Sequence, residues 1–184
     1  MVRRVLADVH ATKDICFSLV VNNFGVKHVV KDTTDHLIQA LNKLYTISID
    51  WTCSLYCGLT INWDYAKRVC DISMPTYIKE ALHKFQHPAP SHPQDAPHAW
   101  NQPVYGAAVQ YADQPDDCPL LPPKSINLVQ QIIGTLLHYS IAVDPTMLVS
   151  IGAIASHQSK ATQTTRDATV WLLNYVASHP NATI

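Results

Sequence analysis

A cluster of prolines divides this chain more sharply than any other feature of its sequence. Nine of the twelve prolines lie in residues 88–123, among Ala, Gln, Asp and His, with no apolar periodicity. Proline fixes φ and lacks a backbone N–H, so a segment this rich in proline does not form regular structure over most of its length. We therefore expect residues 88–123 to be a linker or an extended segment that lies on the surface.

The part after the prolines has the pattern of helices. Apolar residues recur at helical spacing over 125–142, 145–157 and about 165–178, and Asp144 is placed to cap the second of these segments. Residues 124–184 are therefore predicted to form one helical region.

The part before the prolines, residues 1–87, contains a predicted β-hairpin. Two apolar runs flank the pair Asn22-Asn23 within residues 16–30. Asparagine tolerates positive φ, which a type I′ turn requires at both central positions. We therefore place Asn22 and Asn23 together at the tip of the hairpin.

Strands and helices alternate in the rest of this part. An amphipathic helix is predicted near 34–45, and a second helix is predicted to begin at Pro75, where a proline costs no hydrogen bond. Between them, residues 53–63 and 67–74 are expected to be strands joined by a polar turn. The predicted fold class is therefore α+β.

Composition limits the classes of function. The chain has 184 residues, 47% of them hydrophobic, and a formal net charge of −1, without the concentrated basic face of a typical nucleic-acid binder. No run approaches the roughly 18 apolar residues of a membrane helix. Five scattered cysteines are typical of free thiols, so we expect an intracellular protein, cytoplasmic or nuclear, with no membrane partner.

Two groups of histidines and cysteines could in principle bind a metal, but in both cases an interpretation without a metal is favoured. His83 and His87 lie four apart on the second predicted helix, but no third ligand is fixed nearby, which favours solvated histidines. Cys53 and Cys57 lie within one predicted strand, with Cys70 beyond, so we expect thiols packed in a sheet rather than a zinc site. Neither a nucleophile elbow nor a phosphate-binding glycine loop occurs. The residues by themselves therefore give no positive indication of catalysis.

The order of three motifs is informative. "FSLVVNNFGVKHV", "SLYCGLTINWDYAKRVCDISMPTYIKEALHKF" and "QQIIGTLLHYSIAVDPTMLVSIGAIAS" follow one another over residues 16–178. Together they resemble the copia-type reverse transcriptase of LTR retrotransposons, in which a hairpin carries a Val-Asp-Asp box. The resemblance implies a retroelement polyprotein fragment, with a partial palm domain at 1–87, a Pro-rich linker at 88–123 and a helical thumb or connection region at 124–184.

The resemblance also implies RNA-templated DNA synthesis with Mg²⁺ held by the paired aspartates, and here the chain departs from the family. Asn22 and Asn23 stand at the positions of both aspartates. An amide offers one neutral oxygen and N–H donors in place of the anionic oxygens that two-metal transfer requires. The family's other metal-binding aspartate lies upstream, where only Asp8 and Asp14 occur, outside its motif. We therefore expect a pseudo-enzyme without a bound cofactor, truncated at both ends relative to the family.

Two alternatives to an inactive remnant stay open. A residual binding module would hold an RNA or DNA primer-template, or another polyprotein segment, without chemistry. Its phosphate contacts would come from five basic residues, although scattered surface cations equally serve solubility: Lys27, Lys31, Arg68, Lys79 and Lys84. A weakly active polymerase would instead use another carboxylate, such as Asp32, Asp35 or Asp71.

Overall fold

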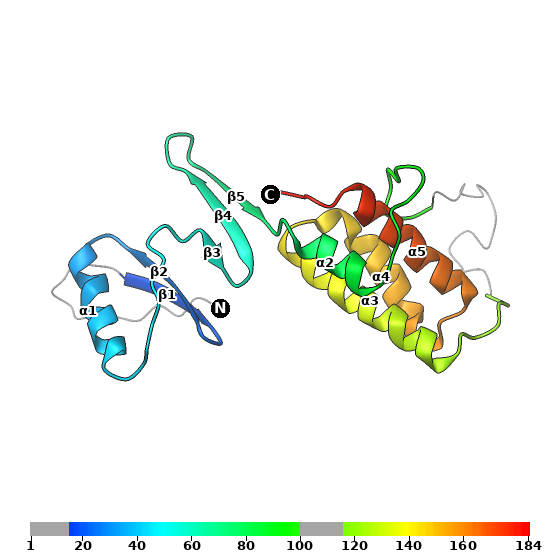
Figure 1. The fold of residues 1–184 in the computed structure, drawn as a ribbon, viewed down its shortest axis with the longest axis horizontal. Helices are drawn as coiled ribbons and strands as arrows, with labels where there is room; N and C mark the ends of the chain where they lie inside the picture. Colours follow the sequence, from blue (N-terminus) through cyan, green and yellow to red (C-terminus); the bar gives the residue numbers. More distant parts are fainter. Residues whose placement is uncertain (1–14, 100–115) are drawn as a thin grey trace, which may run out of the picture. The chain divides into compact units, whose positions relative to one another are not determined.

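A computed structural model describes residues 15–99 and 116–184. The chain divides into two compact units, the first ending at Asp71 and the second running from Ile72 to Ile184. Its described elements are helices and two small sheets, so the fold is mixed α and β (Figure 1). Asp8 and Asp14 lie outside the described residues.

The first unit contains the predicted hairpin and the helix that follows it. Strands β1 (Ile15–Val20) and β2 (Asn23–His28) pair antiparallel, with Leu19 opposite Phe24. Helix α1 (Lys31–Asn42) packs against β2. Both predictions are confirmed, although the helix ends about one turn earlier than expected.

The turn of the hairpin lies one residue earlier than predicted. Its two central residues are Val21 and Asn22, because Asn23 is already paired in β2 opposite Val20. Of the two, Val21 alone has a positive φ, at 55°. Asn22 and Asn23 therefore lie at and next to the turn, as predicted, but the turn is not a type I′ turn centred on both asparagines.

The register of the hairpin is explained by a close approach at Gly25. This glycine lies opposite Ser18, and a Cβ built on it would lie 3.2 Å from the ring of Tyr56. The hydroxyl groups of Ser18 and Tyr56 are 2.7 Å apart, within hydrogen-bonding distance. A turn centred on both asparagines would place Gly25 opposite Val20 and lose this fit, since a change of register re-pairs every side chain.

A three-stranded sheet follows, in the order β3 (Leu55–Tyr56), β4 (Leu59–Asp64), β5 (Val69–Ser73). The strand predicted over 53–63 is interrupted, because Cys53 and Cys57 have φ of 49° and 53°. Left-handed backbone cannot continue a pleated strand, so the two cysteines lie in turns on either side of β3. The expectation that they share one strand is wrong.

The second unit is helical. It contains α2 (Tyr77–Lys84), α3 (Pro123–Ala142), α4 (Leu148–His157) and α5 (Gln163–Ser178), with short 3₁₀ turns η1 (Pro145–Met147) and η2 (Gln158–Lys160). The three helices predicted after the prolines are confirmed, and Asp144 accepts a hydrogen bond from the Thr146 N–H at 3.2 Å, as a cap. Pro75 lies two residues before α2 rather than at its first position, which corrects the predicted helix start.

The buried apolar core belongs to the second unit. Its apolar side chains all lie within residues 74–176, among them Leu136, Ile151 and Leu172. In α2, Ile78 and Ala81 are buried, and α2 packs against α5. This packing places the division between units after Asp71, whereas the sequence predicted a boundary after residue 87. Among the described residues of the first unit, only Thr34 is buried.

The described part of the proline-rich segment lies against the helices. Residues 88–99 form no helix or strand (Figure 1). The Gln94 N–H donates to Ser178 Oγ at 2.9 Å, and the Trp171 indole N–H donates to the Ala96 carbonyl at 2.9 Å. Of the two expectations, the structure supports an extended surface segment for 88–99. Helix α3 already begins at Pro123, because proline is tolerated in a first turn.

Candidate functional site

The two asparagines lie together at the exposed tip of the hairpin. Asn23 Nδ2 donates to Asn22 Oδ1 at 3.3 Å, and both side chains are exposed. Val21 beside them is 92% exposed, so nothing buries it to compensate for its left-handed backbone. For a β-branched residue that conformation costs roughly 1–2 kcal/mol, and strain of this kind is concentrated at functional turns.

The groups at this tip do not fit a two-metal centre. Asn22 Oδ1 already accepts a hydrogen bond, and neither amide supplies the negative charge with which carboxylate ligands offset two Mg²⁺ ions. Asp32 and Asp35 lie on α1 and Asp71 lies on β5. Within residues 15–99 and 116–184, no three His, Cys, Asp or Glu side chains form a group that could hold a metal ion.

The five basic residues predicted as phosphate contacts are divided between the units. Lys27 on β2, Lys31 on α1 and Arg68 in the β4–β5 turn belong to the first unit, and all are exposed. Lys79 and Lys84 are exposed on α2 in the second unit. The three cations of the first unit come from three separate elements, and only two lie on one helix in the second unit. The five residues therefore do not form one basic helix face.

The histidines predicted to share a helix face do not do so. Helix α2 ends at Lys84, and Gln86 has a φ of 53°, so the chain turns between His83 and His87. The ring of His87 instead lies 2.8 Å from Asn174 Oδ1, and His83 is exposed.

The cysteines are free thiols. All five lie in the described ranges and none forms a disulfide. Burial raises the pKa of the Cys53 thiol, and the neighbouring charge of Asp50 adds to this. Because a zinc ligand or a nucleophile must be the thiolate, this environment opposes either role for Cys53.

The sequence analysis missed a hollow of about 450 Å³ in the first unit. It is lined by three aromatic side chains, three polar ones and one aliphatic one: Trp51, Trp63, Tyr65, Thr52, Ser54, Asn62 and Ile61. We call it the aromatic hollow. The signal in the sequence was the alternation of Ile61, Trp63 and Tyr65, which puts three large side chains on one side of β4 and its continuation.

A hydrogen-bonded loop forms one side of the aromatic hollow. The Asp50 carboxylate accepts hydrogen bonds from the N–H and hydroxyl of Thr52 at 2.9 and 2.5 Å. It also accepts from the N–H and hydroxyl of Ser54 at 2.8 and 3.0 Å, and from the Leu55 N–H at 3.4 Å. The Thr52 and Ser54 hydrogen bonds hold the pKa of Asp50 well below its usual range, so this carboxylate is ionised at neutral pH.

The helical unit has a hollow of its own, of about 400 Å³, between the 97–99 segment and helices α4 and α5. His98, Ser150 and Asp167 all line it. Ser150 Oγ lies 3.3 Å from His98 Nδ1, but Asp167 Oδ1 accepts from Gln163 Nε2 at 2.7 Å. Asp167 makes no hydrogen bond with His98 among the described contacts, so the three do not form a Ser-His-Asp relay.

Comparisons with protein-family models, with curated proteins and with solved structures find no match to this chain. None of the described helices is both long enough and apolar enough to cross a membrane.

Proposed function

We propose that this chain is a catalytically inactive relative of the copia-type reverse transcriptases, corresponding to the palm-to-connection part of a retroelement polyprotein. The observation that carries the proposal is the hairpin tip. Two side-chain amides lie 3.3 Å apart at an exposed, strained turn, at the positions where the family's motif has paired aspartates. The ordered motifs over residues 16–178 support the same ancestry.

The loss of charge at the tip is sufficient to explain inactivity. Two-metal nucleotidyl transfer uses anionic ligands to offset the charge of both ions beside the incoming phosphates. If each lost anion costs several kcal/mol in the transition state, the rate falls roughly 10³-fold or more. In the family the first aspartate is the more direct ligand, so Asn22, which lies in the turn itself, matters more than Asn23 in the strand.

Primer extension tests this proposal. The purified chain should make no DNA on an RNA template with Mg²⁺ or Mn²⁺. A fusion of this chain to an intact upstream palm should also be inactive, and Asn22→Asp with Asn23→Asp should restore synthesis in that fusion. A matched Asn22→Ala, Asn23→Ala fusion controls for disturbance of the turn and should stay inactive. Robust synthesis by the asparagine fusion would contradict the proposal.

The alternative is a binding module for nucleic acid or a polyprotein partner, without chemistry and inside the cell. It is favoured by the exposed cations Lys27, Lys31 and Arg68 in the unit that carries the hairpin. An RNA–DNA hybrid should then be retarded in a gel shift that weakens with salt, since phosphate contacts release counterions. Binding that is insensitive to salt would count against these residues as the contacts.

A further inference from the structure

The aromatic hollow exposes ring faces beside polar groups. Trp51, Trp63 and Tyr65 are 53%, 45% and 82% exposed. The rings of Trp63 and Tyr65, two residues apart in the chain, lie nearly parallel, with centroids 6.0 Å apart and planes 12° apart. Contiguous exposed apolar surface that is rimmed by polar groups marks an interaction site.

The hollow is held in shape by its own hydrogen bonds. The Trp63 indole N–H donates to the Cys53 carbonyl at 3.3 Å, which fixes the ring beside the 50–55 loop. Five hydrogen bonds to the Asp50 carboxylate hold that loop. A preformed surface loses little conformational freedom when a ligand binds.

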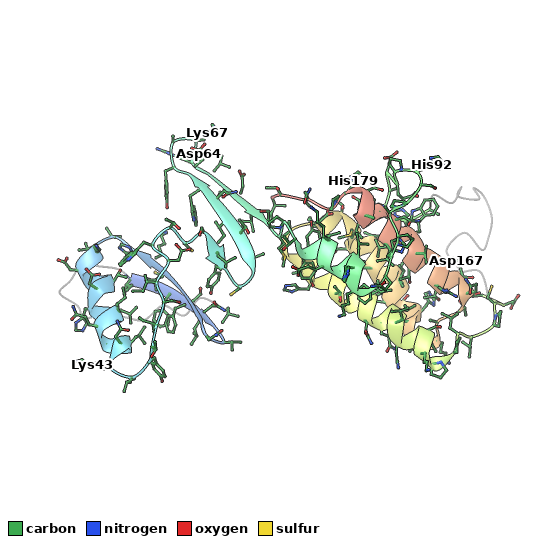
Figure 2. All side chains as sticks on the ribbon, in the orientation of Figure 1. Lys43, Asp64, Lys67, His92, Asp167 and His179 are labelled. Carbon is green, nitrogen blue, oxygen red and sulfur yellow. The ribbon has the colours of Figure 1, made fainter. Side chains whose placement is uncertain are left out.

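The charges around the hollow balance, which favours a neutral ligand. The Asp50 carboxylate beside it is ionised, and the Lys31 ammonium lies 5.0 Å from the centre of the Trp51 ring. Asp64 is paired with Lys67, whose Nζ lies 3.0 Å away (Figure 2). The described part of the first unit contains five Lys or Arg and five Asp or Glu, so it carries no net charge that would attract an anion or a cation.

The hollow offers free hydrogen-bond donors. Both oxygens of the Asp50 carboxylate already accept hydrogen bonds from the loop. The Trp51 indole, the Asn62 amide and the Tyr65 hydroxyl line the hollow, can each donate, and make no hydrogen bond among the described contacts. A complementary ligand therefore brings unpaired acceptors and apolar rings, and no charge.

We propose that the aromatic hollow binds a proline-rich polypeptide in the polyproline II conformation. The carbonyl groups of such a helix make no internal hydrogen bonds, so they supply the acceptors that the three donors require. Its pyrrolidine rings pack on aromatic faces, and its fixed φ leaves little entropy to lose on binding. A saccharide fits less well, because its hydroxyl groups also need acceptors and the Asp50 carboxylate is already occupied.

The ligand that we infer is a segment of another polypeptide. The described parts of this chain's own proline-rich segment are held on the helical unit. There the Trp171 indole N–H donates to the Ala96 carbonyl at 2.9 Å, and the Leu121 N–H donates to the Ala161 carbonyl at 2.8 Å. The site is separate from the hairpin tip, and the proposal does not depend on a polymerase ancestry.

Fluorescence anisotropy with the full chain tests the site. The probe is labelled decaproline, compared with a glycine–serine peptide of equal length, which lacks both the rings and the fixed backbone. Decaproline should bind saturably with a Kd below about 1 mM. Its affinity should be the same at about 50 mM and about 500 mM salt, because the ligand is neutral.

Four outcomes of this measurement would overturn the proposal. They are equal binding of both peptides, no saturable binding of decaproline, a roughly tenfold loss of affinity at the higher salt, and displacement of decaproline by excess cellohexaose. The last of these would assign the hollow to a saccharide.

Matched variants locate the binding on the hollow. Tyr65→Ala should weaken decaproline binding about fivefold or more, as the loss of an aromatic anchor does, whereas Tyr45→Ala should leave it unchanged. Tyr45 is a suitable control because it is 64% exposed in the same unit and does not line the hollow. Tyr65→Phe keeps the ring and removes one donor, so it should weaken binding by a smaller factor than Tyr65→Ala. Equal losses from Tyr65→Ala and Tyr45→Ala would place the binding elsewhere and overturn the proposal.

Discussion

The side-chain amides of Asn22 and Asn23 satisfy each other at the tip of the β1–β2 hairpin, where Nδ2 of one donates to Oδ1 of the other at 3.3 Å. Two carboxylates at these positions could not make this contact, because neither has a proton to donate and their like charges repel. As amides the pair needs no cation between them.

Restoring both charges should make the tip responsive to metal. In Asn22→Asp, Asn23→Asp, we expect the free energy of unfolding without metal to change by less than about 0.5 kcal/mol, since both side chains are exposed. Mn²⁺ should then raise the melting temperature of the variant but not of the parent chain, because binding to the folded state stabilises it. Asn127→Asp, at an exposed site on α3, is the control, and an equal response there would argue against a local metal effect.

The strained turn should be improved by a residue that tolerates left-handed backbone. Val21→Asn should stabilise the hairpin by about 0.5–1 kcal/mol, because asparagine relieves the cost at φ 55° and Val21 is too exposed to lose packing. Slower hydrogen exchange of the β1 and β2 amides would report the gain. Val29→Asn, at a residue that is 76% exposed and has no positive φ, should give none.

The hydrogen bonds that the Asp50 carboxylate accepts should persist to a lower pH than those of an ordinary aspartate. The Thr52 and Ser54 hydrogen bonds lower the pKa of Asp50 in the folded chain below the ordinary value of 3.8. Its contribution to stability is therefore complete above about pH 4 and is lost as the pH falls through the lowered pKa. Carbonyl ¹³C titration should find the Asp50 pKa below 3.8, and Thr52→Ala should raise it towards that value because its hydroxyl is the largest cause. An unchanged pKa in the variant would contradict this account.

The stability of the helical unit should depend strongly on buried side chains and less on their partly exposed neighbours. Leu136 is fully buried in α3, so Leu136→Ala should lower the free energy of unfolding by about 2–5 kcal/mol. Leu137 is 39% exposed on the same helix, and Leu137→Ala should cost under about half as much. Denaturation followed by helical circular dichroism measures both, and equal losses would mean that the core is not where the structure places it.

The sequence predicted best those elements whose signals are local. The helices after the prolines follow from apolar spacing, and the Asp144 cap follows from one side chain before Pro145. The hairpin was predicted from two apolar runs and a polar pair. These signals act over a few residues, so the rest of the chain does not alter them.

The errors have two causes: a distant contact outweighs local preference at the hairpin, and a local hydrogen-bonded loop interrupts the apolar run over 53–63. Asparagine pairs favour the centre of a turn, but Tyr56 packing on Gly25 sets a register that puts Val21 there instead. The apolar run over 53–63 was read as one strand, whereas the loop held by Asp50 bends the chain at Cys53. The aromatic hollow was missed because its members come from a loop and from β4 and the turn after it, which only folding brings together.

By itself, the sequence determined the three helices after the prolines, the hairpin with the helix that follows it, and the absence of helix and strand from residues 88–99. The tertiary structure alone decided the hairpin register and the assignment of α2 to the helical unit. The physical reason is the range of the interactions. Periodicity, capping and proline geometry act between neighbours in the chain, whereas the hairpin register and the packing of α2 on α5 depend on side chains many residues apart.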